Sequence, residues 1–416
     1  MKLKGITIKG VYGQQRLSFQ GGRIEHSVGI VRGFDGEMNL NSTFKALEGK
    51  SLDITIGGSF MSKYQADNND LLVLPENVGA YGGRARLRYK RFSLDGEYII
   101  KEQDPSLDNG YIYNYGYAAL FNFGYSQKGL GIILSAKSVD NMSYRSDRTK
   151  ELQDVFINYL PAMNKTHTYN LVASLYPYAT QPVGEIAYQA EVLYTIKRGT
   201  RLGGKYGTSI NANFSTAYRP NQHTANIDIN DSSRVMYETG FFDMSDSLYW
   251  RDINVNIYRK FSKKFNLRVS YFNISLNNDV AKVTDNAKGI IHTHTGVIEM
   301  GFKFSKKHSL RTELQALFVE DDKDGNINDN GNWATILLEY NVSPHWFFSI
   351  MDQYNYGNSI EVERLHYPLV TGGYLQGPHR FSIQYGKQRA GVFCVGGVCR
   401  AVPASNGVTF TLTTSF

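Results

Sequence analysis

Two cysteines near the carboxyl end have a spacing that predicts a covalent bond. Cys394 and Cys399 flank Gly396 and Gly397, and a two-residue primed turn at these glycines would make the cysteines a non-hydrogen-bonded pair of a hairpin. Their Cα atoms would lie about 4.5–5.5 Å apart, which suits a disulfide in an oxidising compartment. A redox or metal-binding pair is the alternative, although C-x4-C without further cysteines or organised histidines makes a poor zinc site.

A second candidate is an acidic loop that places oxygen ligands at alternate positions, Asp322, Asp324, Asn326 and Asn328. This spacing is similar to the first part of a calcium-binding loop. The loop lacks the glycine in the middle and the bidentate glutamate at the end of such a loop, and Asp, Asn and Gly are also the residues that turns require. We favour a solvated, turn-rich loop, with calcium binding as the alternative.

Three arginines, Arg84, Arg86 and Arg88, share one face of an expected strand. If this strand belongs to the wall of a barrel, the functional interpretation is a path for anions along the lumen. Ion pairs with Asp95 and Glu97 of the next expected strand are the structural interpretation.

Other catalytic and metal signals are weak. His292 and His294 would point the same way from a strand, but no carboxylate or third histidine lies nearby in the sequence to complete a metal site. A nucleophile elbow, a phosphate-binding loop and a zincin helix are all absent from the sequence. We predict that the protein is not an enzyme and uses no cofactor. A lipase or protease triad assembled from distant strands is the alternative.

The elements that must position these residues are strands with one apolar and one polar face. The last segment shows the pattern most clearly, because Val408, Phe410, Leu412 and Phe416 fall on one side and hydroxyl-bearing residues fall on the other. We interpret this strand as a membrane-insertion signal. The same alternation recurs at 206–215 and 253–261, in strands of about ten to fourteen residues, which suit a tilted membrane crossing better than a soluble sandwich.

Composition supports a β-rich membrane protein. Among 416 residues there are 29 Tyr, 23 Phe and 40 Gly but only 10 Pro, and aromatic residues supply the interfacial girdles of barrels. Since no apolar run reaches the length of a membrane helix, any span must be a closed barrel. The net charge of +7 is scattered without a basic helix or a stacked aromatic motif, so we predict no nucleic-acid partner.

Short and long connections alternate along the chain, as in an up-and-down barrel with short periplasmic turns and long extracellular loops. The predicted short turns are Leu47–Lys50, Lys90–Ser93, Gln127–Gly129, Pro161–His167, Arg198–Lys205, Phe261–Phe265, Ser305–His308, Val342–His345 and Leu375–His379. The predicted long loops are Tyr64–Gly79, Gln103–Asn114, Ser143–Gln153, Pro177–Gly184, Pro220–Ser247, Asn277–His292, Glu320–Gly331, Gly357–Glu363 and Phe393–Asn406.

The alternation predicts an all-β fold, a transmembrane up-and-down antiparallel β-barrel of about 18 strands (roughly 14–20), formed by one domain, 1–416. Such a lumen must hold water, inward-folded loops or a plug, and no plug domain is evident in the sequence. The chain opens with no apolar signal-peptide core and starts inside an expected strand. We therefore expect a mature or truncated form that lacks N-terminal strands. An ordinary cytosolic start is the alternative.

Several stretches resemble a Bacteroidota outer-membrane β-barrel family of unestablished function. They are Pro75–Tyr81, Tyr144–Arg148, Ile157–Ala162, His167–Tyr169, Tyr176–Pro182, Gly203–Thr208 and Cys394–Pro403. The resemblance covers nearly the whole chain. It implies a barrel in the outer membrane and supplies no catalytic residues.

Together these observations predict an outer-membrane protein of a Gram-negative bacterium, with outer-membrane lipid as its surroundings and the barrel-assembly machinery as a partner during insertion. A pore or transporter for an unknown solute is the first hypothesis. A non-conducting scaffold or accessory subunit that holds other outer-membrane proteins in a secretion or insertion complex is the second. A soluble β-sheet adhesin is the third.

Overall fold

The computed structural model describes residues 2–17, 24–150, 154–224, 235–281, 289–320, 331–389, 391–395 and 398–414. Within them, 19 strands join into one sheet in which every pairing is antiparallel and each strand bonds to the next strand of the sheet. The strands are β1 (Lys2–Leu3), β2 (Ile6–Arg16), β3 (His26–Asn39), β4 (Leu52–Tyr64), β5 (Asn77–Tyr89), β6 (Phe92–Lys101), β7 (Gly116–Gln127), β8 (Leu130–Asp140), β9 (Gly184–Ile196), β10 (Thr208–Pro220), β13 (Met244–Lys260), β14 (Phe265–Asn277), β15 (Ile290–Lys303), β16 (His308–Val319), β17 (Trp333–Val342), β18 (Trp346–Tyr354), β19 (Leu369–Gln376), β20 (His379–Gln388) and β23 (Ser405–Thr414).

The connections contain short elements of their own. Two small hairpins pair β11 (His223–Thr224) with β12 (Tyr237–Glu238) and β21 (Gly391–Val395) with β22 (Val398–Val402). The helical turns are α1 (Leu40–Thr43), η1 (Lys45–Leu47), η2 (Leu107–Asn109), α2 (Asn170–Ser174), α3 (Asn278–Ala281) and η3 (Glu361–Glu363). In the part of the chain that the structure describes, no helix is both long and apolar enough to cross a membrane.

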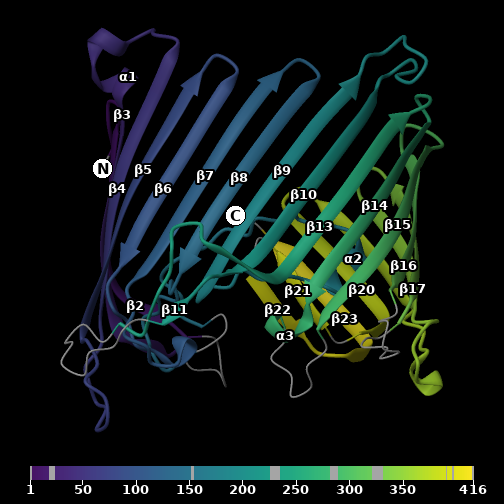
Figure 1. Ribbon diagram of the computed structural model, residues 1–416. Coiled ribbons are helices and arrows are strands. Elements are labelled where there is room, and N and C mark those ends of the chain that lie inside the picture. The colour runs from purple at the N-terminus through teal and green to yellow at the C-terminus, as the bar shows by residue number, and fades with distance from the viewer. Residues whose placement is uncertain are drawn as a thin grey trace.

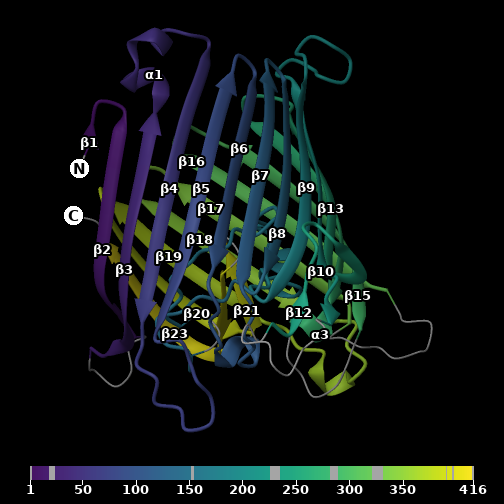
Figure 2. The ribbon, with the colours of Figure 1, turned by 60° about the vertical axis from the view of Figure 1, so that its left-hand side comes forward.

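The large sheet curls so that its late strands lie behind its early ones (Figures 1 and 2). This confirms the predicted all-β, up-and-down antiparallel architecture and its strand number. Within the described residues, however, β23 bonds only to β20, and β2 bonds only to β1 and β3. The circle of hydrogen bonds is therefore open between β2 and β23.

The two faces of the sheet differ as the alternation predicts. In β14, Val269 and Tyr271 are exposed on the outer face, whereas Ser270 and Phe272 are almost fully buried on the inner face. The outer face of the described strands keeps exposed apolar side chains on most of its circumference, for example Ile56, Leu94, Phe123, Ile257, Ile298, Ile336, Ile350 and Ile383.

One predicted connection is wrong. Pro161–His167 was expected to be a tight turn between two strands, but it lies within the connection between β8 and β9, whose one regular element in the described residues 141–150 and 154–183 is α2. The other predicted short turns all fall between the strands of hairpins at one end of the sheet, and the predicted long loops fall at the other end. Apolar and polar residues alternate locally in 154–176 as they would in a pair of strands, yet this segment packs inside the sheet.

Candidate functional site: an inner segment along the lumen wall

The described residues of the β8–β9 connection, 141–150 and 154–183, form what we call the inner segment, which lies on the concave face of the sheet. Its first half contacts the early strands. The Tyr144 hydroxyl donates to the Val78 carbonyl of β5 at 2.7 Å, and the Ser146 hydroxyl lies 2.7 Å from that of Ser27 in β3. At Gly29 of β3 an added Cβ would meet the Ser146 carbonyl oxygen at 1.8 Å, so only glycine permits this approach.

The second half of the inner segment contacts the later strands. His167 Nε2 lies 2.7 Å from Asp252 Oδ2 in β13, and the Gln353 side chain of β18 donates to Asn170 Oδ1 at 2.7 Å. The side chain of Arg389, which follows β20, donates to a carbonyl of α2 at 3.1 Å. One segment therefore bonds to strands around most of the circumference and narrows the enclosed space.

Helix α2 anchors the inner segment in an apolar cluster. Leu171 and Val172 are buried, and the Leu171 backbone N–H donates to Gln315 Oε1 in β16 at 3.0 Å. The cluster combines residues of the inner segment with inner-face residues of the wall, Met163, Tyr169, Leu171, Val172, Leu175, Tyr176, Tyr178, Ala187, Ala217, Tyr249, Trp250, Phe272, Ile274, Leu276, Ile291, Val297, Leu317 and Trp333. If the inner segment left the wall, these packed apolar side chains would be exposed to water, so the cluster stabilises the segment in place.

Two buried ion pairs hold the ends of the connections against the wall. Lys137 Nζ of β8 lies 2.7 Å from Glu185 Oε1 of β9, with side-chain exposures of 2% and 1%. Lys63 Nζ of β4 lies 2.7 Å from Asp104 Oδ1, with exposures of 0% and 2%. Charges this deeply buried require their partners, because a lone charge there would be strongly destabilising.

The Lys137–Glu185 pair also fastens the inner segment directly. Lys137 Nζ donates to the Pro161 carbonyl at 2.8 Å, while Glu185 Oε2 accepts from the Tyr178 hydroxyl at 2.6 Å and from the Gln181 backbone N–H at 2.9 Å. Burial, reinforced by the Glu185 carboxylate, raises the pKa of Tyr178 well above its usual range. The Tyr178 hydroxyl is therefore a permanent donor at physiological pH.

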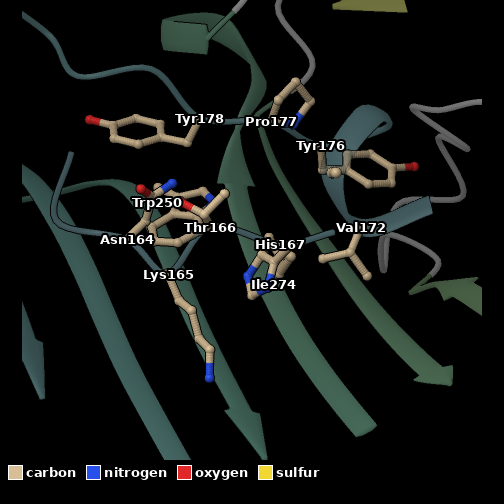
Figure 3. Close-up of a pocket in the computed structure, with 11 residues that line it drawn as sticks. Asn164, Lys165, Thr166, His167, Val172, Tyr176, Pro177, Tyr178, Trp250 and Ile274 are labelled. Carbon is tan, nitrogen blue, oxygen red and sulfur yellow. The ribbon is translucent and has the colours of Figure 1, made fainter. Parts of the chain in front are cut away.

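A small cavity separates the inner segment from β13 and β14 (Figure 3). The Tyr178 ring stacks on Trp250 with 5.6 Å between centroids, and Lys165 extends away from the other labelled side chains. The cavity holds about 30 Å³ of free space, enough for roughly one water molecule. It is a packing gap, too small to be a solute site.

The predicted arginine row lies on the inner face and is largely neutralised. Arg84 Nη1 lies 2.7 Å from Asp35 Oδ1, and Arg84 Nε lies 3.4 Å from Glu37 Oε2, both in β3. Arg86 Nε lies 2.6 Å from Asp95 Oδ1 in β6. The expected partner Asp95 is confirmed for Arg86, whereas the acidic partners of Arg84 come from β3, two strands away.

Open space adjoins this row. One cavity of about 220 Å³ is lined by Arg84 and Arg86 together with Glu37, Asp95 and Glu97. A neighbouring cavity of about 360 Å³ is lined by polar and charged residues that include Arg86, Arg88, Asp53 and Asn39. None of the lining residues belongs to the inner segment, so the arginine row faces space that this segment leaves free.

A second charged cluster was missed in the sequence. Arg311 of β16 lies 3.0 Å from Glu299 and 3.8 Å from Glu339, on the two neighbouring strands, and also pairs with Glu313. The cross-strand register brings the four side chains together, and no local pattern in the sequence indicates this meeting. The lumen wall therefore carries charges of both signs in two places, on β3 to β6 and on β15 to β17.

The histidine pair has ordinary partners. His292 Nδ1 lies 2.8 Å from the Ser275 hydroxyl, and His294 contacts the Tyr271 hydroxyl at 2.6 Å and Glu320 at 2.5 Å. The hydrogen bond to His294 lowers the pKa of Glu320. No group of three or more His, Cys, Asp or Glu side chains that could hold a metal occurs among the described residues.

The remaining predicted sites are only partly described. Cys394 and Cys399 are directly opposed in the β21–β22 register, as predicted, but their side chains lie outside the described part, so the disulfide stays a prediction. The calcium-loop candidates Asp322, Asp324, Asn326 and Asn328 lie outside the described residues, as does Phe416. In the described part of the terminal strand, Val408, Phe410 and Leu412 are all more than half exposed.

No curated protein matches the chain. Similar solved structures include the outer membrane protein OpdK from Pseudomonas aeruginosa, with 13% identity, coverage of 92% of each chain and a TM-score of 0.37. Another is OccAB3 from Acinetobacter baumannii, with 9% identity, coverage of 99% of this chain and 98% of that one, and a TM-score of 0.40. These values are too low to carry an argument about this chain. A family model matches residues 1–416 in full, and the chain belongs to the family described as a family of unknown function, DUF6029.

Proposed function

We propose that the protein is an outer-membrane β-barrel that forms a narrowed, porin-like passage for small hydrophilic solutes. The observation that carries the proposal is the division of one large antiparallel sheet into an apolar outer face and a charged inner face. In β17, for example, Ile336, Leu338 and Tyr340 are exposed, while Thr335 and Glu339 face the other side. A surface of exposed apolar side chains this extensive favours lipid over water as its surroundings.

In a membrane, the two open edges of the sheet, β2 and β23, need hydrogen-bond partners. Hydrocarbon offers no partner for backbone N–H and C=O groups, so β2 and β23 must be paired in the bilayer. The inner segment already links the neighbourhoods of both edges. Gln15 of β2 donates to the Phe156 carbonyl at 2.7 Å, and Arg389, just after β20, donates to Ser174. The outer membrane of a Gram-negative bacterium is the proposed location, with β23 as the segment taken by the barrel-assembly machinery.

The solute path follows from the open cavities. Ion pairs with carboxylates of β3 and β6 hold Arg84 and Arg86 at the wall, beside about 220 and 360 Å³ of space. Fixed charges of both signs favour small ions and polar solutes, since they replace part of the hydration that such solutes lose in a narrow passage.

The second candidate, a non-conducting scaffold, is favoured by one observation. The buried pairs Lys137–Glu185 and Lys63–Asp104 fix the connections firmly inside the sheet, and a fixed inner segment that closed the passage would leave only binding roles. Electrical measurement separates the two functions, because a sealed barrel gives no steady current.

The experiment is single-channel recording in planar bilayers. We expect small, steady conductance steps, and we expect Arg86→Glu to shift the reversal potential in a salt gradient toward cation selectivity. Lys306→Glu, at a tight turn away from the arginine row, is the matched control and should leave the reversal potential unchanged. Complete absence of current from inserted protein would eliminate the passage and leave the scaffold.

A further inference from the structure

The connection between β10 and β13 folds back over the outside of the sheet. We call residues 235–244, which are the second described part of this connection and the first residue of β13, the outer clasp. The Phe241 ring lies 6.3 Å from Tyr98 of β6 and 6.1 Å from Tyr117 of β7, and the Phe242 ring lies 6.3 Å from Phe121. In Figure 1 the coloured part of this connection that leads into β13 crosses in front of the loop-side ends of β7 to β9.

The contacted face is the one that carries the exposed apolar side chains. Tyr117 is directly opposite Ile100 in the sheet register, and Ile100 is 46% exposed. Since directly opposed residues share a face, Tyr117 and Ile100 point outward together. The inner segment, by contrast, contacts Lys101, whose Nζ donates to the Ser143 carbonyl at 2.8 Å and which follows the outward Ile100 in β6.

The outer clasp covers a patch that is unlike the rest of the outer face. Ala119, Ser138 and Ile186 point outward, yet each is at most 1% exposed. Asp140, also outward, is 3% exposed and accepts hydrogen bonds from Tyr237 and Thr239, both at 3.1 Å.

A carboxylate on a lipid-facing surface is costly. The outer clasp removes this one from the surface and supplies its hydrogen-bond donors.

The clasp is held in one conformation by aromatic packing. Phe242 adopts a left-handed backbone with φ 57°, which is strained for a side chain of this size. Its ring lies 6.0 Å from Tyr188 of β9 and 4.8 Å from Phe241. The strain persists because these contacts fix the ring against the wall.

Three apolar side chains of the clasp remain exposed beside the apolar belt. They are Phe241 at 58%, Met236 at 46% and Met244 at 42%. Phe241 lies beside Tyr98 and Tyr117 at the loop-side ends of β6 and β7, where aromatic side chains of barrels meet the headgroup region.

We propose that the outer clasp is a membrane anchor whose Phe241 and Met236 side chains contact the acyl chains of the outer leaflet. The inference rests on the proposed membrane location. The contact of the exposed Phe241 with Tyr98 and Tyr117 of the outer face favours lipid as the occupant, and the covered Asp140 explains why the clasp must lie against the wall.

The test uses tryptophan fluorescence and brominated lipids. Trp346→Phe removes the exposed tryptophan, while Trp250 and Trp333 are at most 2% exposed and give a constant background. Phe241→Trp is the clasp probe, with Met236→Trp as a second in case the first disturbs packing. Ile253→Trp is the belt probe, because Ile253 is exposed on the outer face near the middle of β13.

In bilayers, we expect bromines near the headgroups to quench the clasp probes more than bromines deep in the chains, and the belt probe to show the reverse order. If the belt probe is quenched while both clasp probes keep their fluorescence, the anchor is refuted and the membrane location survives. That result would indicate that a protein, or water, covers the clasp. If neither kind of probe is quenched, the membrane location itself fails.

Discussion

The buried Lys137–Glu185 pair gives the sharpest test of how the inner segment is held. Glu185→Gln keeps the size of the side chain and an oxygen that can accept from Tyr178 and Gln181, but it removes the only carboxylate within 4 Å of the Lys137 ammonium among the described residues. The substitution therefore leaves a buried charge without a counter-ion. Breaking such a pair typically costs about 3–5 kcal/mol.

The cost should appear as release of the inner segment. Lys137 also donates to the Pro161 carbonyl. If the unpaired Lys137 ammonium becomes hydrated, this hydrogen bond to the inner segment breaks. At about 1.4 kcal/mol for each factor of ten, a loss of 3–5 kcal/mol raises the released population by at least about 100-fold. Limited trypsin digestion measures the population in which the inner segment has left the wall, because trypsin reaches Lys165 only in that state. The cleavage rate is proportional to this population when the segment returns to the wall faster than trypsin cleaves it.

Two variants control the interpretation. Glu191→Gln breaks the Lys165–Glu191 pair, in which the Lys165 and Glu191 side chains are 25% and 19% exposed and lie 3.3 Å apart. Because this pair is partly solvated, we expect its loss to cost at most about 1 kcal/mol. Adding Lys137→Met to Glu185→Gln removes the unpaired charge and should restore much of the protection. The reasoning is refuted if Glu185→Gln is cleaved at the parent rate, or if the double variant is cleaved as fast as Glu185→Gln alone.

Three further outcomes follow from the faces and contacts of the sheet. Val255→Arg puts a charge on the outer face and should cost about 2–4 kcal/mol in unfolding from bilayers, whereas Asn256→Arg on the inner face should be tolerated; equal losses would contradict the assigned facing. Leu171→Ala deletes fully buried side-chain atoms and should cost about 2–5 kcal/mol, measured by the same trypsin assay; unchanged protection would mean that α2 does not anchor the inner segment. Thiol reagents should label Cys394 and Cys399 only after reduction, and labelling of the unreduced protein would rule out the disulfide.

Local sequence patterns were sufficient for the strands and most of their connections. The alternation in the terminal segment correctly predicted a strand, and the short turns rich in Lys, Ser and Gly correctly marked hairpin ends. The opposed backbone positions of Cys394 and Cys399 were predictable as well, because the length of a hairpin turn fixes the register next to it. These features depend on neighbours in sequence.

The inner segment could not be predicted in this way. Residues 154–176 carry enough alternation to resemble a strand pair, but their contacts are with Gln15, Asp252 and Gln353, far away in sequence. Likewise, the sequence indicated Asp95 and Glu97 as acidic partners for the arginine row. The structure gives Arg84 partners in β3, because the register of β3, β4 and β5 puts Gly57, which has no side chain, between Arg84 and Glu37 along the wall.

The sequence by itself therefore determined a sheet of alternating strands with one apolar and one polar face, since side-chain alternation is a property of each strand. Only the tertiary structure decided that the inner segment, 141–150 and 154–183, lines the concave wall, that Lys137 meets Glu185, and that Phe241 and Phe242 pack on the outer face. These contacts depend on curling the whole sheet, which brings together residues that no local pattern connects.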